Sequence, residues 1–266
     1  MDLRRKRVLV TGASRGIGAE IAHRVAERGA HVIAVARTRE PLEKLASLVG
    51  GTAIAADLAD FSQLDGLFDR AEADGPVDVL INNAGLGMAA GIAAMDPGHA
   101  RRLYDVNLVA PTELCRQAAV RMLARGSGRI VNVSSMAAAA AGPGMSVYAA
   151  SKAGLSHFTE GLRLDLRGSG VGVTLVEIGP VSTEMMEDFD DHPPTRALMD
   201  RLHRVRALRD LRPEEVAEAI VRAIVDDRRV VRLPGLASVL HAFPSFPRRM
   251  TELLLAGIPS RPDHAP

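Results

Sequence analysis

The chain has a single cysteine and few aromatic residues, and its charges nearly cancel. Its 266 residues include one Cys, no Trp, two Tyr and six Phe, with 33 basic side chains against 32 acidic ones. Because one cysteine cannot form an internal disulfide, a reducing, cytoplasmic setting is expected. Cys115 is expected to be a small buried residue rather than a nucleophile. The net charge of +1 argues against a nucleic-acid-binding surface.

Long hydrophobic runs are also missing. The basic start, residues 1–7, is followed by the run Val8-Leu9-Val10, which is too short for the core of a signal peptide. No stretch approaches the roughly 20 apolar residues that a bilayer-spanning helix needs. The basic start is therefore interpreted as a solvated lead-in to a strand, with membrane targeting as the weaker reading.

Short runs rich in Val and Ile alternate with helical patterns along most of the chain. Strands are predicted at 8–11, 31–36, 52–56, 77–82, 129–134, 171–177 and 230–233, and helices near 16–28, 39–49, 61–73, 97–125, 148–167 and 213–226. The strand runs are apolar almost throughout, as in strands covered on both faces. The alternation predicts an α/β fold, a doubly wound (Rossmann-type) parallel sheet of about seven strands flanked by helices on both faces.

The domain organisation follows from the same pattern. The chain length of 266 residues suits one large α/β domain with a full core. No linker or internal repeat divides the chain, so residues 1–266 are predicted to form a single dinucleotide-binding catalytic domain. Residues 182–212, crowded with Met, Asp, His and Arg, are predicted to form a substrate lid, and about 234–266 a C-terminal tail.

Three glycines follow the first predicted strand and open a helix. Gly12, Gly16 and Gly18 permit a tight turn and let the backbone approach a pyrophosphate. The helix N-terminus adds unpaired N–H groups and the positive end of the helix dipole. A position between strand and helix makes this motif more specific for a dinucleotide than glycines alone. The alternative is that the glycines serve only the turn.

The second predicted strand ends at Ala36-Arg37 without a carboxylate. In dinucleotide folds a carboxylate there binds the ribose 2′-hydroxyl, whereas arginine accommodates a 2′-phosphate. Arg37, with Arg15 and Arg39 nearby, therefore favours NADP (NADPH) over NAD; a solvated Arg37 is the alternative. Asp57 is expected either to accept a hydrogen bond from the adenine amino group or to cap the next helix.

Tyr148 and Lys152 stand four residues apart in a predicted helix, so their side chains share one face. A neighbouring ammonium is expected to lower the pKa of the phenol, which can then give or take a proton near neutral pH. The only other tyrosine is Tyr104, which argues against an ordinary buried residue. The histidines are scattered without ligand spacing, and no metal is expected.

These motifs, with Asn82-Asn83-Ala84-Gly85 after the fourth predicted strand, resemble the short-chain dehydrogenase/reductase (SDR) family, NADP-preferring type, over about residues 5–232. The resemblance implies hydride transfer between NADP(H) and a carbonyl or alcohol, with Tyr148 as the acid or base. Lys152 would lower the tyrosine pKa and hold the nicotinamide ribose. Ser135, with Ser134 as the alternative, would bond the substrate oxygen, and Asn107 would join a water-linked proton relay.

The turn after the sixth predicted strand departs from the family pattern. It reads Ile178-Gly179-Pro180 where the family commonly has Pro-Gly. The resemblance still implies that Thr183 bonds the nicotinamide carboxamide. The residues expected to bind the cofactor are Gly12, Ser14, Arg15, Gly16, Ile17, Gly18, Arg37, Asp57, Leu58, Asn83, Ala84, Gly85, Tyr148, Lys152, Gly179, Val181 and Thr183.

The substrate is expected to be a small-molecule carbonyl or alcohol compound, mostly apolar and bulky. The segments 86–94, 136–145 and 182–212 are rich in Ala and Met and should roof the pocket. These side chains could instead simply pack the lid, and Arg196 leaves a carboxylated substrate open. The resemblance implies a homodimer or homotetramer. The apolar tail is expected to dock on the domain or a second subunit, with membrane-surface contact as the weaker reading.

Two other functions stay open. The chain could be an NADP(H)-binding, redox-sensing regulator with little turnover, or an SDR-type epimerase or dehydratase. A sensor has no need of the proton path formed by Asn107, Ser135, Tyr148 and Lys152. An epimerase or dehydratase usually needs further acid or base groups, which the sequence does not show clearly.

Overall fold

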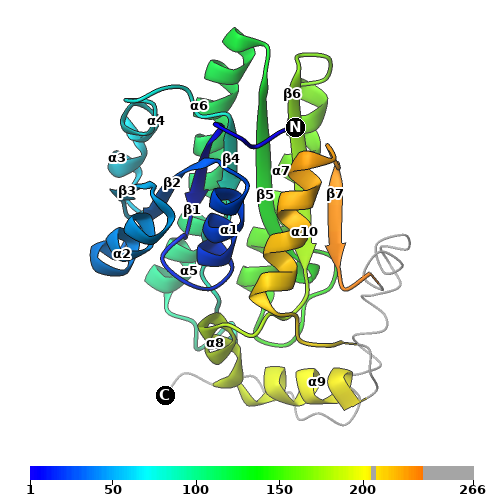
Figure 1. Cartoon of the computed structure of the whole chain (residues 1–266). Coiled ribbons are helices and arrows are strands. Elements are labelled where there is room, and N and C mark those ends of the chain that lie inside the picture. Colours follow the sequence, from blue (N-terminus) through cyan, green and yellow to red (C-terminus); the bar gives the residue numbers. More distant parts are fainter. Residues whose placement is uncertain (205–207, 236–266) are drawn as a thin grey trace.

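The computed structural model of the chain describes residues 1–204 and 208–235 and has one seven-stranded parallel sheet at its centre (Figure 1). The strand order is β3-β2-β1-β4-β5-β6-β7. The doubly wound parallel sheet predicted from the sequence is confirmed. The strands are β1 (Arg7–Thr11), β2 (His31–Ala36), β3 (Thr52–Ala55), β4 (Val79–Asn82), β5 (Gly128–Ser135), β6 (Val171–Ile178) and β7 (Val230–Leu233).

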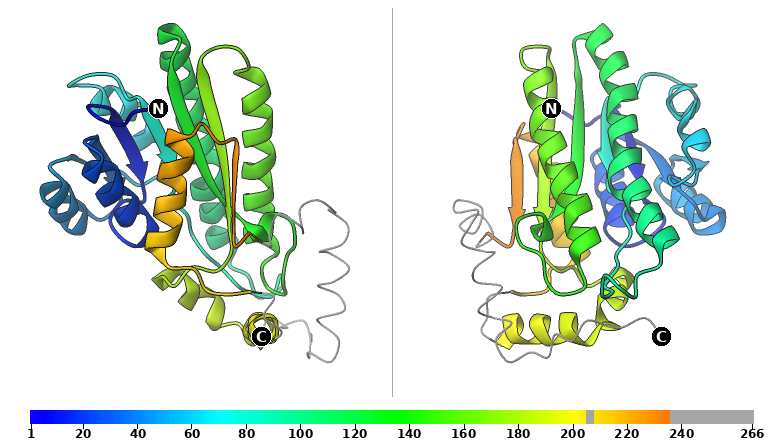
Figure 2. Two further views of the ribbon diagram at one scale, coloured as in Figure 1. Left: turned by 45° about the vertical axis from the view of Figure 1, so that its right-hand side comes forward. Right: turned by 180° about the vertical axis from the view of Figure 1, so that it is seen from behind.

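Helices cover both faces of the sheet (Figure 2). One face carries α1 (Gly16–Glu27), α2 (Arg39–Val49) and α10 (Pro213–Val225), and the other carries α6 (Ala110–Arg125) and α7 (Ser146–Asp165). Successive strand residues point to opposite faces, so in β1 Val8 and Val10 join one core while Leu9 joins the other. Burial on both sides explains why the strands are apolar throughout.

Two helices predicted as continuous are interrupted, and both predictions were wrong in that respect. Residues 61–73 form α3 (Phe61–Leu64) and α4 (Leu67–Ala71), separated at Gly66, which has φ 65°. Residues 97–125 form α5 (Pro97–Tyr104), a π-helical turn, η1 (Asp105–Val109), and α6. The π-turn holds Asn107, and such turns often lie at functional sites.

The segment predicted as a lid crosses the carboxyl ends of the strands (Figures 1 and 2). It contains a 3-10 turn, η3 (Glu184–Met186), and two helices, α8 (Glu187–Asp190) and α9 (Pro193–Arg204). A second 3-10 turn, η2 (Met136–Ala138), follows β5. The predicted tail lies outside the described residues from 236 onward. Of the helices described, none combines the length and apolarity needed to cross a bilayer.

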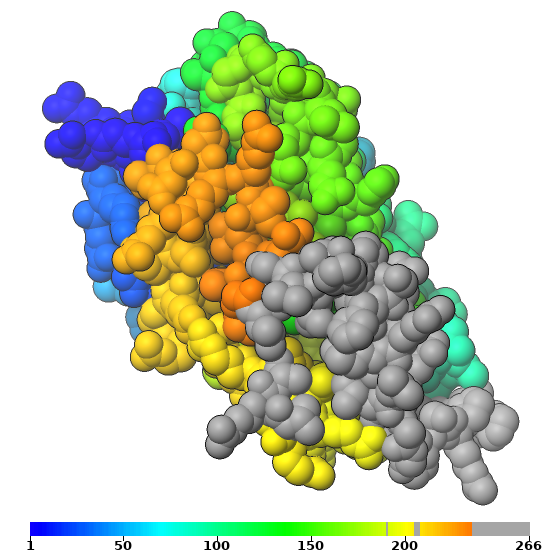
Figure 3. Space-filling model, turned by 90° about the vertical axis from the view of Figure 1, so that its right-hand side faces the viewer, coloured from blue at the N-terminus to red at the C-terminus, as the bar shows by residue number. Residues whose placement is uncertain are grey.

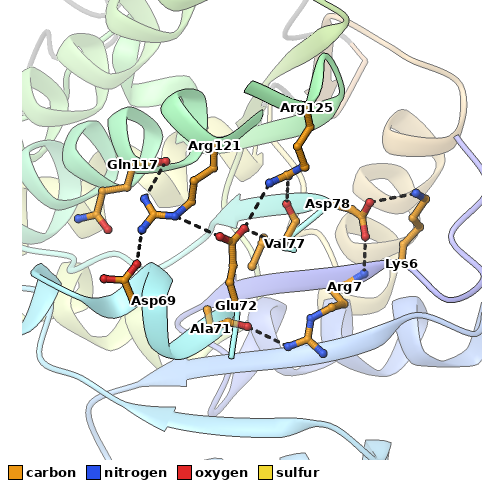
Figure 4. Close-up of polar contacts among 10 residues, drawn as sticks. All are labelled: Lys6, Arg7, Asp69, Ala71, Glu72, Val77, Asp78, Gln117, Arg121 and Arg125. Carbon is orange, nitrogen blue, oxygen red and sulfur yellow. Dashed lines mark hydrogen bonds and ion pairs between the residues drawn. The ribbon is translucent and has the colours of Figure 1, made fainter. Parts of the chain in front are cut away.

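The opposite end of the sheet is held by charged side chains from several elements (Figure 4). Asp78, before β4, accepts hydrogen bonds from Lys6 Nζ and from the Arg7 backbone N–H, both at 2.9 Å. Glu72, after α4, pairs with Arg121 and Arg125 of α6 at 3.1 and 3.4 Å. These contacts tie α4 and α6 to the amino ends of the strands, away from the lid.

Candidate active site

One cavity of about 1230 Å³ lies at the carboxyl ends of the central strands. It includes the crevice between β1 and β4, where the strand order reverses and α/β sheets bind ligands. Every residue predicted to bind the cofactor or to act in catalysis lines this cavity, except Asn107. The structure thus brings together residues that lie as far apart in the chain as Gly12 and Thr183.

Gly12 and Gly18 of the glycine loop have no room for a side chain. Gly12 has φ 66°, and a Cβ there would lie 2.8 Å from Ala84 Cα. A Cβ on Gly18 would lie 2.1 Å from the Gly12 carbonyl oxygen. The first turn of α1 has no side-chain cap, so its backbone N–H groups remain free for an anion. This loop fits the pyrophosphate of a dinucleotide.

The loop after β4 is fastened to the glycine loop. Thr11 Oγ1 accepts hydrogen bonds from the backbone N–H groups of Asn83 and Ala84, at 3.0 and 3.1 Å. The Asn83 amide donates back to the Thr11 carbonyl oxygen at 3.1 Å. These bonds set the spacing of the two loops that flank the cleft.

Arg37 and a second arginine, Arg102 of α5, line the part of the cavity that also includes Asp57. Arg102 donates a hydrogen bond of 2.7 Å to Asp57, which also accepts from the Ala59 N–H. Burial alone would raise the pKa of Asp57, but these hydrogen bonds lower it on balance. Asp57 does not cap the next helix, as one reading predicted, because Asp60 does so.

The other two arginines expected near a 2′-phosphate are engaged in ion pairs. Arg15 is paired with Glu184 of η3, and both side chains are exposed. Arg39 pairs with Glu43 on its own helix. Of the three arginines, Arg37 lines the cavity and forms no ion pair with another described residue.

Tyr148 and Lys152 are buried on the same face of α7, at 8% and 5% exposure. Burial raises the pKa of Tyr148, and a side-chain hydrogen bond with Ser135 offsets part of the rise. Burial lowers the pKa of Lys152 to about 8, and its Nζ donates to the Val133 carbonyl oxygen at 3.1 Å. The pKa of Tyr148 is not lowered by Lys152 in this structure, contrary to the expectation from the sequence.

Asn107 lies behind the cavity wall and is completely buried. Its side-chain oxygen accepts from the Leu86 N–H at 2.8 Å, and its amide donates to the Leu86 carbonyl oxygen at 3.0 Å. A Cβ on Gly85 would lie 3.3 Å from Lys152 Nζ and 3.4 Å from Asn107 Oδ1. Asn107 therefore fixes the loop that passes beside Lys152.

A buried polar chain that the sequence did not reveal supports the first turns of α7. Glu177 of β6 is 3% exposed and binds Arg232 of the edge strand β7 (orange, Figure 3) at 2.8 Å. Ser156 Oγ lies within hydrogen-bond distance of two acceptors, Ser134 Oγ at 2.8 Å and Glu177 Oε1 at 3.2 Å. Ser134 donates to the Lys152 carbonyl oxygen at 2.9 Å. The Ser134 hydroxyl thus donates its hydrogen to the backbone of α7, whereas Ser135 contacts Tyr148.

The cavity beyond Tyr148 is lined almost entirely by apolar side chains. Phe189 of α8 packs edge-to-face on the Tyr148 ring, with 5.1 Å between centroids. The Phe189 ring therefore forms an apolar wall beside the phenol. Thr195 also lines this half, and its apolar lining residues are Leu86, Met136, Ala139, Ala140, Ala141, Met145, Met185, Met186, Phe189, Leu198, Met199, Leu202 and Leu208.

The described residues do not favour catalysis by a cysteine nucleophile or by a metal ion. Cys115 is buried, as expected, and burial raises the pKa of its thiol to about 12, so the thiolate nucleophile is not formed near neutral pH. Within 1–204 and 208–235, no three His, Cys, Asp or Glu side chains gather where they could share a metal ion.

Comparisons with known proteins match this geometry. The family model described as short chain dehydrogenase matches residues 6–194. A ketoacyl reductase of Nostoc is 40% identical over 226 residues, which are 82% of this chain and 75% of that protein. A fatty acyl-CoA reductase of Acinetobacter baylyi is 34% identical over 251 residues, 91% of this chain and 81% of that protein.

Solved structures agree with the sequence matches. A short-chain dehydrogenase from Sphingobium yanoikuyae in complex with NADPH superimposes with a TM-score of 0.76 at 29% identity, covering 96% of this chain and 97% of that one. A gluconate 5-dehydrogenase from Burkholderia cenocepacia in complex with NADP and tartrate gives 0.78 at 28%, covering 90% and 98%. With the sheet, the glycine loop and the family match all in agreement, this chain belongs to the short-chain dehydrogenase/reductase family of oxidoreductases.

Proposed function

We propose that the protein is an NADPH-dependent reductase of a carbonyl group carried on an apolar substrate. The observation that carries the proposal is the position of Tyr148, Ser135 and Lys152 in the same cavity as the glycine loop. One cavity therefore contains both a proton donor and a loop that can bind the phosphates of a cofactor. The family match supports the oxidoreductase class.

The residues present fit a dinucleotide. The glycine loop and the free N–H groups at the start of α1 would hold the pyrophosphate. Asn83 to Gly85 and Val181 to Thr183 line the cavity farther along and would hold the nicotinamide half. When bound, the cofactor supplies a hydride. Two structural neighbours, named as complexes with NADPH or NADP, support this assignment.

The protein residues handle the proton and the substrate oxygen. Burial keeps the Tyr148 phenol protonated at neutral pH, which is the form that gives a proton to a carbonyl oxygen. Ser135 shares a hydrogen bond with that phenol and would steady the charge developing on the same oxygen. Lys152, held by the Val133 carbonyl, would hold the ribose and replenish the tyrosine. Asn107 would join the proton relay that ends at Lys152, because it holds the loop at Gly85 that passes beside the Lys152 ammonium.

The preference for NADPH rests on Arg37. It lines the cavity at the end of β2, where a carboxylate would serve NAD. Arginine pairs well with phosphate because its planar fork donates two parallel hydrogen bonds.

The substrate half of the cavity favours an apolar molecule. Its lining side chains in the described residues are chiefly Ala, Met, Leu and Phe. The ketoacyl reductase and the fatty acyl-CoA reductase among the relatives are named for substrates with acyl chains.

We further propose that the protein works as a homo-oligomer. Val120 and Leu123 of α6 and Leu164 of α7 are 57%, 48% and 71% exposed on the outer helical layer. Val120 and Leu123 stand three residues apart and so share one face of α6, and an exposed apolar helix face favours a protein–protein contact.

The function is tested by incubating the protein with NADPH and a panel of aliphatic ketones, aldehydes, 3-oxoacyl thioesters, steroids and sugars. Loss of NADPH absorbance with apolar carbonyl compounds, and formation of the alcohol, is the expected result. Tight NADPH binding without oxidation by any carbonyl would contradict the proposal and favour an NADP(H)-binding regulator.

A further inference from the structure

The lid is seated on the loop after β5 through one face of α9 and the residues that lead into it. Thr195 Oγ1 donates to the Pro143 carbonyl oxygen at 2.7 Å. A Cβ on Gly142 would lie 2.9 Å from Leu198 Cδ2, and a Cβ on Gly144 would lie 2.7 Å from His192 Nδ1. We call this contact of residues 142–144 with His192, Thr195 and Leu198 the seam. Without side chains on the loop glycines, the helix can approach the backbone closely.

The seam closes one side of the substrate half of the cavity. Leu198 is 4% exposed and Thr195 is 1% exposed, and both also line the cavity. The Thr195 hydroxyl is already bonded to Pro143. The seam therefore offers a substrate a surface of carbon atoms and no free polar side chain among its described residues.

The cavity wall along α9 is long in one direction. Thr195, Leu198, Met199 and Leu202 all line it. The seven residue steps of α-helix from Thr195 to Leu202 rise about 10 Å. The facing loop contributes Ala139, Ala140 and Ala141, which take little space. Two apolar walls of this kind match an extended aliphatic chain rather than a polyol.

We propose that this half of the cavity binds an unbranched aliphatic chain attached to the reacting carbonyl, and that Leu198 at the seam sets the chain length that fits. The inference rests on the proposed function, because it places the reacting carbonyl at Tyr148. It adds the substrate class and a specificity-determining residue.

The test measures binding and turnover separately. Hexanamide, decanamide and tetradecanamide, which are not reduced, are titrated calorimetrically into the protein with and without NADPH. Methyl ketones of matched length are assayed for turnover. Affinity is expected to rise by about two- to fourfold for each buried methylene, then level off where the chain meets Leu198.

Substitutions at Leu198 are expected to move that limit. Leu198→Ala lengthens the best-bound chain, and Leu198→Phe shortens it. Leu48→Ala, on the exposed face of α2, is the matched control and leaves the limit unchanged. Two opposite shifts cannot come from a general loss of folding, since a loss of folding would weaken all chain lengths.

The outcomes separate the two proposals. Amide binding that depends on chain length, without ketone turnover, would sustain the chain site and contradict the reductase. Ketone turnover with affinities independent of length, or a length limit unmoved in both Leu198 variants, would overturn the chain site and leave the reductase standing.

Discussion

Burial disfavours the charged forms of both Tyr148 and Lys152. Burial raises the pKa of the phenol and lowers that of the ammonium to about 8. The sequence motif predicts the pairing of the two residues but not this balance, because the cost of burial depends on the walls that surround them. Those walls come from β5, α8 and the loop after β4.

The depressed pKa of Lys152 makes a pH-dependent contribution to stability. An unfolded lysine keeps its proton up to about 10.5, whereas the folded one loses it near 8. Between these values the unfolded state binds more protons, so this group stabilises the fold increasingly as pH rises. Relative to Lys152→Met, the wild type should gain up to about 3 kcal/mol between pH 7 and pH 10.5.

Urea unfolding of the two proteins at a series of pH values measures that difference. A difference that stays constant from neutral to alkaline pH would mean that Lys152 is not depressed in the folded state.

Arg37 is expected to discriminate between the two nicotinamide cofactors. Arg37→Ala removes a charge-assisted contact with a 2′-phosphate, and a hydrogen bond of this kind contributes about 1.5–3 kcal/mol. The dissociation constant of NADPH should rise roughly tenfold to a hundredfold, while that of NADH changes little. Titration with each cofactor measures this.

Arg39→Ala is the matched control, because Arg39 pairs with Glu43 and does not line the cavity. Equal losses for NADPH and NADH in Arg37→Ala would show that Arg37 does not contact the 2′-phosphate.

At the scale of elements, the buried Glu177 joins β6, β7 and α7. The substitution Arg232→Met removes the ion-pair partner of the buried Glu177 carboxylate. Breaking a buried pair in this way costs about 3–5 kcal/mol. The free energy of unfolding should fall by about that amount, as measured by urea denaturation.

The same substitution on the surface provides the comparison. Arg222 pairs with Glu218 but is 69% exposed, and exposed pairs contribute about 0–1 kcal/mol. A loss in Arg232→Met no larger than that in Arg222→Met would mean that Glu177 does not depend on Arg232.

Most helices and strands could be predicted because the sequence patterns that indicate them are local. The bounds 39–49 of α2 and the six-residue β2 follow from apolar spacing and flanking glycines. The break at Gly66 and the π-turn around Asn107 were missed. Both interrupt an otherwise helical pattern, and packing against neighbours, not local preference, decides whether such a pattern continues.

Across the whole molecule, contacts that are distant in sequence were the least predictable. The residues lining the cofactor cleft could be named because they belong to short motifs. The Arg102–Asp57 pair spans 45 residues and the Glu177–Arg232 pair spans 55. No short motif marks either pair, so only the folded sheet reveals them.

The cavity and the ion pairs that stabilise the sheet lie at opposite ends of the strands. The ion pairs of Asp78 and Glu72 hold the amino ends of the strands (Figure 4), while the cavity and the lid lie at the carboxyl ends. Substitutions in the cavity can therefore change catalysis without removing those anchors.

In the proposed reaction, Tyr148 passes a proton to the substrate oxygen. The most direct measurement is the rate of NADPH oxidation by Tyr148→Phe beside Tyr104→Phe, which removes the hydroxyl of the only other tyrosine. We expect Tyr148→Phe to lose at least about a hundredfold in kcat while it still binds NADPH, and Tyr104→Phe to keep the wild-type rate. A Tyr148→Phe variant that reduces the same carbonyl at nearly the wild-type rate would contradict it.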